Sequence, residues 1–445
     1  MKRFIPENHR ARQVLAISVP IIGAMISQNI LNLVDAAMVG HLGSSAMAAV
    51  GIVGFLNFMA VALFMGLATG VQVIVARRIG ENLAAEAAVP LNGSLLLNLT
   101  FALPFSIMLY LLAPWFITFI IDDPEVIAQA QPYMQMRLMG VTAIAMNFCY
   151  RGFWSGIKQT HYYMWVLFAM HALNILLNYT LIFGNFGFPE LGIVGAGLGT
   201  SISMIVGTVC HFFLCLKKCK SYGFMHGLPS MKSIKNMIRL SVPASIQQFF
   251  FATGFTMLFW IIGKVGTDAL AAANILTNLT LVAILPCIAF GMSASTLISE
   301  ALGRKDPDDA YQWAWDVSVI AMFIISLIAL PMFIFAQPIL SIFLIEQSAL
   351  QVATVPLKIV AIGLPLEALS LVMMSSLMGA GATKVTMQIS MGMQWLLFLP
   401  IAWLLGPVLG FGLTAIWSAQ IVYRSSQAFL YVFFWKKNNW RNIRV

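Results

Sequence analysis

Long apolar stretches alternate along the chain with short polar segments that hold most of its charges. A helix crosses a bilayer core of about 30 Å with about 20 mostly apolar residues. Continuous stretches of this length favour helices over barrel strands, which would be short and alternating. The expected transmembrane helices cover residues 14–39, 50–75, 92–113, 133–156, 162–183, 194–216, 238–262, 272–298, 316–336, 357–379, 386–405 and 411–434.

The overall composition agrees with a membrane protein. Of 445 residues, 60% are hydrophobic and only 9% are charged, which is too apolar for a water-soluble chain of this length to bury in one core. The first apolar stretch follows basic residues and lacks a small-x-small cleavage site, so we expect a retained helix and not a signal peptide. The sequence thus predicts an all-α integral membrane protein with twelve transmembrane helices.

Positive charge is concentrated in alternate loops, although the net charge is +9 overall. One set of loops carries most of the basic residues, including Arg77 with Arg78, Lys217 with Lys218, and Lys436 with Lys437. The opposite loops hold only Lys264 and Lys358. Because basic loops stay in the cytoplasm, this pattern predicts that both termini are cytoplasmic in a bacterial inner membrane. The basic excess then reports orientation and attraction to lipid heads, and we expect no nucleic-acid partner.

Catalytic and cofactor motifs are missing from the sequence. The dipeptide Gly263-Lys264 lacks the surroundings of a phosphate-binding loop, and there is neither a His-Glu-x-x-His nor a Gly-x-Ser-x-Gly run. The five cysteines form no Cys-x-x-Cys pair, so reduced thiols are expected. We therefore expect no enzyme, no metal and no cofactor other than a coupling ion.

An internal repeat divides the chain. Ser18-Val19-Pro20 recurs as Ser241-Val242-Pro243, an offset of 243 − 20 = 223 residues. The same offset relates Gly43 to Gly266, Gly80 to Gly303, Gly140 to Gly363, and Thr160 to Thr383. Six helices per copy give both copies the same orientation, related by a pseudo-two-fold axis along the membrane normal, with a substrate cavity between them. The predicted division is an N-lobe over residues 1–216, a cytoplasmic linker over 217–237 and a C-lobe over 238–445.

These features together resemble the multidrug and toxic compound extrusion (MATE) family over essentially the whole chain. The resemblance rests on the six-plus-six helices, Pro20 and Pro243 near the start of each half, the stretch 34–43 with its partner 262–266, and the glycine-rich stretch 192–200. It implies export of organic cations and other amphipathic, drug-like compounds in exchange for inward protons or sodium. A lipid-linked saccharide flippase of the same superfamily is the alternative, although flippases often have additional helices and a cationic cavity. We expect a monomer whose partners are substrates and membrane lipids.

Polar residues inside the predicted helices mark candidate sites. Only Asp35 and Glu367 are carboxylates well inside a helix, where a charge costs about 3 kcal/mol unless it is paired, hydrated or neutralised. Around Asp35, spacings of three and four predict shared helix faces and a polar cluster. The expected members are Gln28 and Asn32 in the first helix, His171, Asn174 and Asn178 in the fifth, and Thr200 and Ser203 in the sixth.

In the DinF-like branch of the MATE family, which the chain resembles, the matching cluster is the cation site. The resemblance implies that Asp35, Asn174 and Thr200 belong to this site. Asn178 departs from the pattern, because the branch often has a second carboxylate there, and its loss favours protons over sodium. Desolvation is expected to raise the pKa of Asp35, so that protonation rearranges its hydrogen bonds and lowers the affinity for a bound cation. A purely structural Asp35 is the alternative.

The second candidate site lies in the C-lobe. Glu367 and Arg424 lie at similar depths, which predicts a structural ion pair. The functional alternative is a C-lobe cation or substrate site that also includes Gln247 and Gln248. Elsewhere, Arg137 is expected to extend to the membrane interface, and His171 to be a hydrogen-bonded packing residue.

Overall fold

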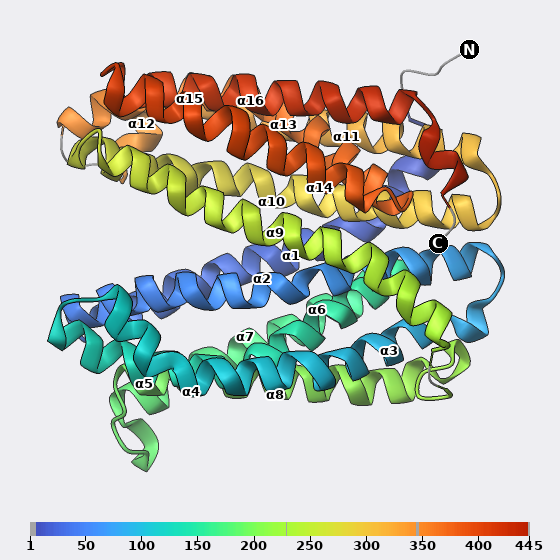
Figure 1. Ribbon diagram of the computed structural model, residues 1–445, viewed down its shortest axis with the longest axis horizontal. Coiled ribbons are helices and arrows are strands. Elements are labelled where there is room, and N and C mark those ends of the chain that lie inside the picture. The colour runs from blue at the N-terminus through green and yellow to red at the C-terminus, as the bar shows by residue number, and fades with distance from the viewer. Residues whose placement is uncertain (1–5, 228, 344–346, 444–445) are drawn as a thin grey trace. The chain divides into compact units, whose positions relative to one another are not determined.

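The computed structural model describes residues 6–227, 229–343 and 347–443, and these ranges contain helices but no strand (Figure 1). The expected all-α class is confirmed. The first half of the chain forms α1 (Asn8–Gly40), α2 (Ser44–Gly80), η1 (Ala84–Glu86), α3 (Val89–Leu97), η2 (Asn98–Ala102), α4 (Leu103–Ile120), α5 (Pro124–Met139), α6 (Val141–Gly156), α7 (Thr160–Phe183), η3 (Asn185–Gly187), α8 (Ile193–Lys218) and η4 (Lys220–Tyr222). The second half forms α9 (Met231–Gly263), α10 (Thr267–Gly303), α11 (Pro307–Ile334), α12 (Ala336–Ser341), α13 (Gln347–Gly379), α14 (Thr383–Met391), η5 (Gly392–Phe398), α15 (Leu399–Trp403), η6 (Leu404–Val408), α16 (Gly412–Lys436) and η7 (Asn439–Asn442).

The internal repeat is visible in the helix bounds. Helices α1 and α9 both have 33 residues, and their first residues are 231 − 8 = 223 positions apart. Helices α2 and α10 both have 37 residues and the same separation, 267 − 44 = 223. The glycine before each of α2 and α10 has a positive φ, 108° at Gly43 and 151° at Gly266, where a side chain would be strained. Glycine therefore recurs at this position because the turns before α2 and α10 both need a positive φ.

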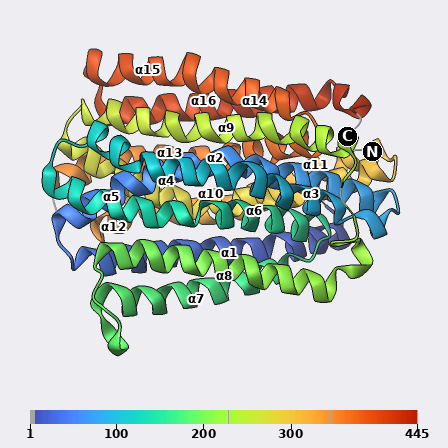
Figure 2. The same cartoon turned by 60° about the horizontal axis from the view of Figure 1, so that its bottom comes forward.

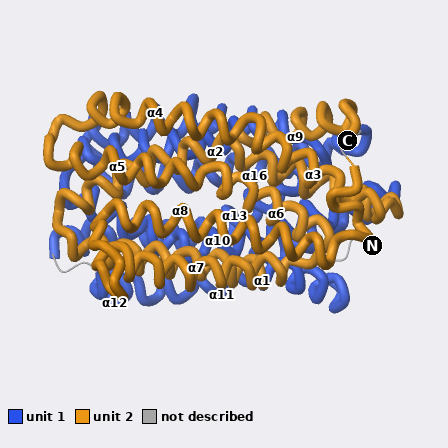
Figure 3. The backbone as a smooth tube through the Cα atoms, turned by 90° about the horizontal axis from the view of Figure 1, so that it is seen from below, with its two compact units in different colours: residues 1–19, 246–445 blue, residues 20–245 orange. Residues whose placement is uncertain are grey.

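Two compact units make up the structure (Figure 3). Unit 1 contains residues 1–19 and 246–445, and unit 2 contains residues 20–245. The boundaries lie inside α1 and α9, at or close to Pro20 and Pro243, whose missing N–H removes one hydrogen bond from each helix. The predicted lobes follow the repeat, whereas the units follow packing. The first part of α1 therefore belongs to unit 1, and the first part of α9 belongs to unit 2.

Within the part of the chain that the structure describes, ten helical segments are long and apolar enough to cross a membrane. Two of the twelve expected ranges are not among them. Range 133–156 corresponds to α5 and α6, which are separated at Gly140, and range 411–434 corresponds to α16. Helices α5 and α6 have 16 residues each, so neither is long enough to cross a membrane alone. Helix α16 has 25 residues, but polar side chains such as that of Arg424 lower its hydropathy.

In unit 1, α10, α11 and α16 pack against α13. The start of α1 is attached to this unit by Arg10, whose side chain is 11% exposed. Its guanidinium lies 2.7 Å from an Asp309 oxygen, 2.5 Å from an Asp316 oxygen and 3.6 Å from the centre of the Trp313 ring. Two carboxylates and an aromatic face thus compensate one half-buried cation.

In unit 2, α2 packs on α5 and α6, and α7 packs along α8 (Figure 2). Small residues permit the close approach of these helices. A Cβ atom at Gly152 of α6 would collide with the Ala68 carbonyl of α2, and one at Gly195 of α8 would collide with the Leu181 carbonyl of α7. Helix α7 is therefore fixed against α8, and its polar face is held in a defined position.

Candidate functional site

A polar cluster joins α1, α7 and α8 within unit 2. Asn178 donates from Nδ2 to Asp35 Oδ1 at 2.8 Å. Asn174 and Asn178 are each 1% exposed, whereas Asp35 is half-buried. The carboxyl group therefore lies at the more exposed edge of a buried amide pair.

The Asn174 amide links Asp35 to α8 when its nitrogen faces α1. In this orientation Nδ2 donates to Asp35 Oδ1 at 3.2 Å, and the amide oxygen accepts from Ser203 Oγ at 3.1 Å and Thr200 Oγ1 at 3.3 Å. The opposite orientation directs Nδ2 to Ser203 Oγ and lets the oxygen accept from Asn178 Nδ2 at 3.3 Å, but it turns that oxygen toward the Asp35 carboxylate. We assign the first orientation because it presents a donor, and not an acceptor, to the carboxylate.

Gly199 of the glycine-rich stretch holds Asn178 in place. A Cβ atom at this position would come closer than 3.0 Å to Asn178 Oδ1, a separation that real Cβ atoms essentially never show. Among the described residues, this oxygen is buried and has no hydrogen-bond partner. Gly199 thus lets the Asn178 amide pack directly on α8, with one acceptor unused.

The polar residues of α1 that were predicted to lie with Asp35 form a second group of contacts around Gln28 and His171. Gln28 donates to Asn32 at 3.2 Å, and Asn32 is exposed. His171 contacts Ser27 Oγ through Nδ1 at 2.7 Å and Gln28 Oε1 through Nε2 at 3.1 Å. These contacts join α1 to α7 about two helical turns before Asp35. Both nitrogens of His171 are occupied, which agrees with a hydrogen-bonded packing role.

Arg137 of α5 adds a positive charge near the cluster. Its guanidinium is close enough to attract the Asp35 carboxylate electrostatically, while its buried Nε has no hydrogen-bond partner among the described residues. The sequence prediction assigned Arg137 to the membrane interface and missed this interaction. No spacing in the sequence could have revealed it, because α1 and α5 are far apart along the chain.

The polar groups of the cluster are one carboxylate, two amides and two hydroxyls, and the atoms that face the Asp35 carboxylate are the two amide nitrogens. Carboxylate, amide and hydroxyl groups suit a proton or a small hard cation and do not suit a transition metal. Within the described residues, no group of three or more His, Cys, Asp or Glu side chains is placed to hold a metal ion.

The C-lobe candidates form an ion pair and a separate contact. Arg424 Nε lies 3.3 Å from Glu367 Oε1, and the side chains are 14% and 8% exposed, so the expected pair is observed. Gln247 is directed elsewhere, with Nε2 at 2.9 Å from the Met374 sulfur. Gln248 is half-buried on the same helix. The structure brings Glu367 and Arg424 together but does not join Gln247 to them.

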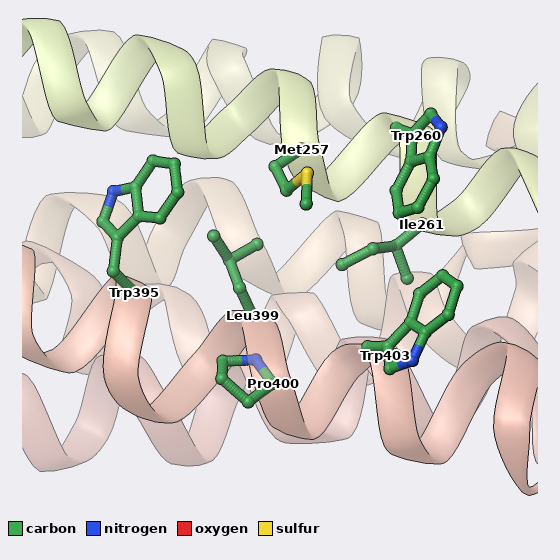
Figure 4. Close-up of a pocket in the computed structure, with 7 residues that line it drawn as sticks. All are labelled: Met257, Trp260, Ile261, Trp395, Leu399, Pro400 and Trp403. Carbon is green, nitrogen blue, oxygen red and sulfur yellow. The ribbon is translucent and has the colours of Figure 1, made fainter.

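An aromatic cavity of about 400 Å³ lies in unit 1, apart from the Glu367–Arg424 pair (Figure 4). The rings of Trp260 in α9 and Trp403 in α15 stack with centroids 5.2 Å apart, and Trp395 and Pro400 also line the cavity. Its lining contains no charged residue. Trp395 lies in the π-helical segment η5, and Trp403 lies in the short helix α15 that follows it.

Comparisons with known proteins identify the family of the chain. Residues 20–180 and 243–404 each match the MatE family, and the two matches begin 243 − 20 = 223 residues apart. A probable multidrug resistance protein NorM from Thermotoga maritima is 26% identical over 97% of this chain and 93% of its own length. An uncharacterized transporter, YisQ, from Bacillus subtilis is 25% identical over 91% of this chain and 90% of its own length.

A solved structure shows the same fold. A variant of the Vibrio cholerae MATE transporter VcmN superimposes with a TM-score of 0.89 and 21% identity, covering 97% of this chain and 98% of the other. Because the family matches cover most of the sequence, the chain belongs to the MatE family of multi-pass membrane transporters, which includes the NorM multidrug resistance proteins and contains transporters and not enzymes.

Proposed function

We propose that this transporter exports organic cations and other amphipathic compounds in exchange for inward protons, and that Asp35 carries the coupling proton. The observation that carries the proposal is the contact of one half-buried carboxylate with two buried amides on α7. Family membership supports multidrug export, and the cluster supports the choice of the coupling residue.

Protonation of Asp35 would change the hydrogen bonds between α1 and α7. The carboxylate accepts from the Asn178 and Asn174 amides. A protonated carboxyl group becomes a donor and needs an acceptor. Asn178 Oδ1 is the unused acceptor of the cluster among the described residues, so rotation of this amide would provide the new partner. A proton thus exchanges one set of contacts for another and removes the negative charge that attracts a cationic substrate.

Protons fit this cluster better than sodium. Asp35 supplies one negative charge, the other groups are neutral, and Arg137 adds a positive charge nearby. A sodium ion would meet this positive charge with little compensation, whereas a proton neutralises the carboxylate directly. The coupling ion is therefore proposed to be H⁺, with Na⁺ as the alternative outcome of the test.

The test measures dye transport into everted membrane vesicles under separately imposed proton and sodium gradients. Wild type is expected to respond to the proton gradient, and Asp35→Asn to fall below about a tenth of that rate, the loss of roughly 1.4 kcal/mol or more. Asp122→Asn is the matched control, because Asp122 is an exposed acid outside the cluster. Sodium-driven transport would overturn the coupling ion, and normal transport by Asp35→Asn at normal expression would overturn the role of Asp35.

We further propose an inner-membrane location with both termini in the cytoplasm and a monomeric transporter. The alternate loops differ strongly in basic residues, which supports this orientation. A fluorescent protein fused after residue 445 should fluoresce in cells, and a periplasm-dependent phosphatase at the same position should be inactive. The reverse result would invert the orientation.

A further inference from the structure

A second groove, of about 690 Å³, opens on unit 2 between α3, η2, α6 and α8. Its wall is mainly apolar and includes Leu96, Leu99, Val209, Phe213 and Met225, all of which are exposed. In a membrane protein, exposed apolar side chains on spanning helices face hydrocarbon. The groove is therefore accessible to the lipid bilayer.

The loop over residues 219–227 forms one edge of the groove and is fixed by a buried amide. Asn92 of α3 donates to the carbonyl groups of Gly223 and Gly227, both at 3.1 Å, and accepts from the Met225 N–H at 3.1 Å. Met225 has a φ of 59°, a left-handed conformation that is uncommon for a residue other than glycine. Three hydrogen bonds thus maintain a strained residue at the edge of the groove, so the groove is preformed.

Three exposed lysines follow one another where α8 ends and the loop begins: Lys217 and Lys218 are the last residues of α8, and Lys220 is the first residue of η4. Val209, Phe213 and Lys217 are spaced by four residues and share one face of α8. Lys217 is about 12 Å along the helix from Val209, at 1.5 Å per residue. A ligand lying along this face would meet apolar groups first and an ammonium group at its end.

The local acids do not cancel this positive charge. Glu86 belongs to η1, which packs against η4 of the loop, and both Glu86 and Glu81 interact electrostatically with Arg78. Arg78 also donates to the Glu86 carbonyl at 2.6 Å and to Ser233 Oγ at 3.3 Å, which holds it beside these acids. Lys217, Lys218 and Lys220 are thus left to attract an anion.

We propose that this groove is a binding site for an anionic phospholipid, with an acyl chain against Leu99, Val209 and Phe213 and the phosphate head group at Lys217 and Lys218. The apolar wall selects a hydrocarbon chain, and the lysines select a negative head group over a zwitterionic one. The site is independent of the coupling ion and of Asp35. A lipid here would also brace the loop that leads from α8 toward α9.

The test measures lipids retained by the full-length protein in detergent, by native mass spectrometry, after equilibration with equal amounts of phosphatidylglycerol and phosphatidylcholine. One lysine near an anionic head group corresponds to roughly a fivefold preference. Wild type is expected to retain phosphatidylglycerol about tenfold over phosphatidylcholine, and the double variant Lys217→Gln/Lys218→Gln to lose at least fivefold of this preference. Lys436→Gln/Lys437→Gln, a basic pair at the end of α16, is the control and should keep it.

A second pair of variants tests the groove itself. Val209→Trp fills the groove and should lower retention of phosphatidylglycerol at least fivefold, with Val209→Phe as the smaller change if the first variant folds poorly. Ile205→Trp is the matched control, because Ile205 is similarly exposed on α8 but does not line the groove. Equal retention of both lipids by wild type would overturn the proposal, as would unchanged retention in the filled groove. Loss of both lipids equally in Val209→Trp, with no effect of the lysine changes, would also overturn the anionic specificity.

Discussion

Gly199→Ala tests whether the packing of Asn178 on α8 controls the Asp35 cluster. The added Cβ would come closer than 3.0 Å to Asn178 Oδ1, whereas ordinary van der Waals contact begins at 3.4 Å. The amide must therefore retreat by more than 3.4 − 3.0 = 0.4 Å. Asn178 uses the other end of the same amide to donate to Asp35 at 2.8 Å. A displacement of the amide thus lengthens or bends the hydrogen bond between α7 and α1.

Two opposing effects decide the size of the change. A hydrogen bond to a charged group contributes about 1.5–3 kcal/mol. Alanine in place of glycine inside a helix favours folding by about 0.5–1 kcal/mol. Loss of most of the bond at Asp35 therefore leaves a net cost of about 1–2 kcal/mol in the cluster, which corresponds to a factor of about 5–30 in an equilibrium constant. The same net cost of about 1–2 kcal/mol is the upper limit of the expected loss of stability, so transport is compared at equal amounts of folded protein.

The assay is proton-driven dye transport in vesicles, with the protein amount measured by immunoblot. Gly199→Ala should slow transport at least about fivefold at normal expression. Gly51→Ala is the matched control, because a Cβ at Gly51 of α2 would meet nothing within 4 Å. The effect of Gly199→Ala should also disappear in an Asn178→Ala background, where the clash is absent. Full activity of Gly199→Ala, or additive effects in the double variant, would refute the reasoning.

Two further substitutions test ion pairs in unit 1. Arg10→Ala should lower the free energy of unfolding in detergent by about 3 kcal/mol, because it leaves the half-buried Asp316 without its ion-pair partner, whereas Asp309 keeps Arg304 at 2.8 Å. The exposed Arg12→Ala should have no such effect. Equal unfolding temperatures of the two variants would contradict the attachment of α1 to this unit. Glu367→Gln should destabilise the protein similarly by leaving Arg424 uncompensated, with the exposed Glu190→Gln as control, and the remaining folded protein should still transport. Normal unfolding with lost transport in Glu367→Gln would instead assign Glu367 to the transport cycle.

Much of the helix pattern follows from hydropathy and repetition. The 223-residue offset found in the sequence reappears in the bounds of α1 with α9 and of α2 with α10. Hydropathy did not predict the π-helical turns η2, η5 and η6, because a single extra residue in a turn leaves the apolar pattern nearly unchanged. It also did not predict that α1 and α9 each divide between two units.

The candidate cluster was only partly predictable. Three- and four-residue spacing brought Asp35, Asn174 and Asn178 into one hypothesis, and the structure joins them by hydrogen bonds. The same spacing placed Asn32 with Asp35, but three residues leave them about 60° apart around the helix, and Asn32 is exposed. Arg137 could not be found this way, because its interaction with Asp35 depends on how two distant helices pack.

The repeat duplicates the scaffold but not the charged groups. The 223-residue offset places Leu258 of α9 where α1 has Asp35, since 35 + 223 = 258. It places Ile144 of α6 where α13 has Glu367, since 367 − 223 = 144. Leu258 is 4% exposed, in the packed interior of unit 1, where an uncompensated acid would be costly. Each carboxylate thus has an aliphatic counterpart, and the ion-coupling chemistry proposed at Asp35 has no second copy at the equivalent position of α9.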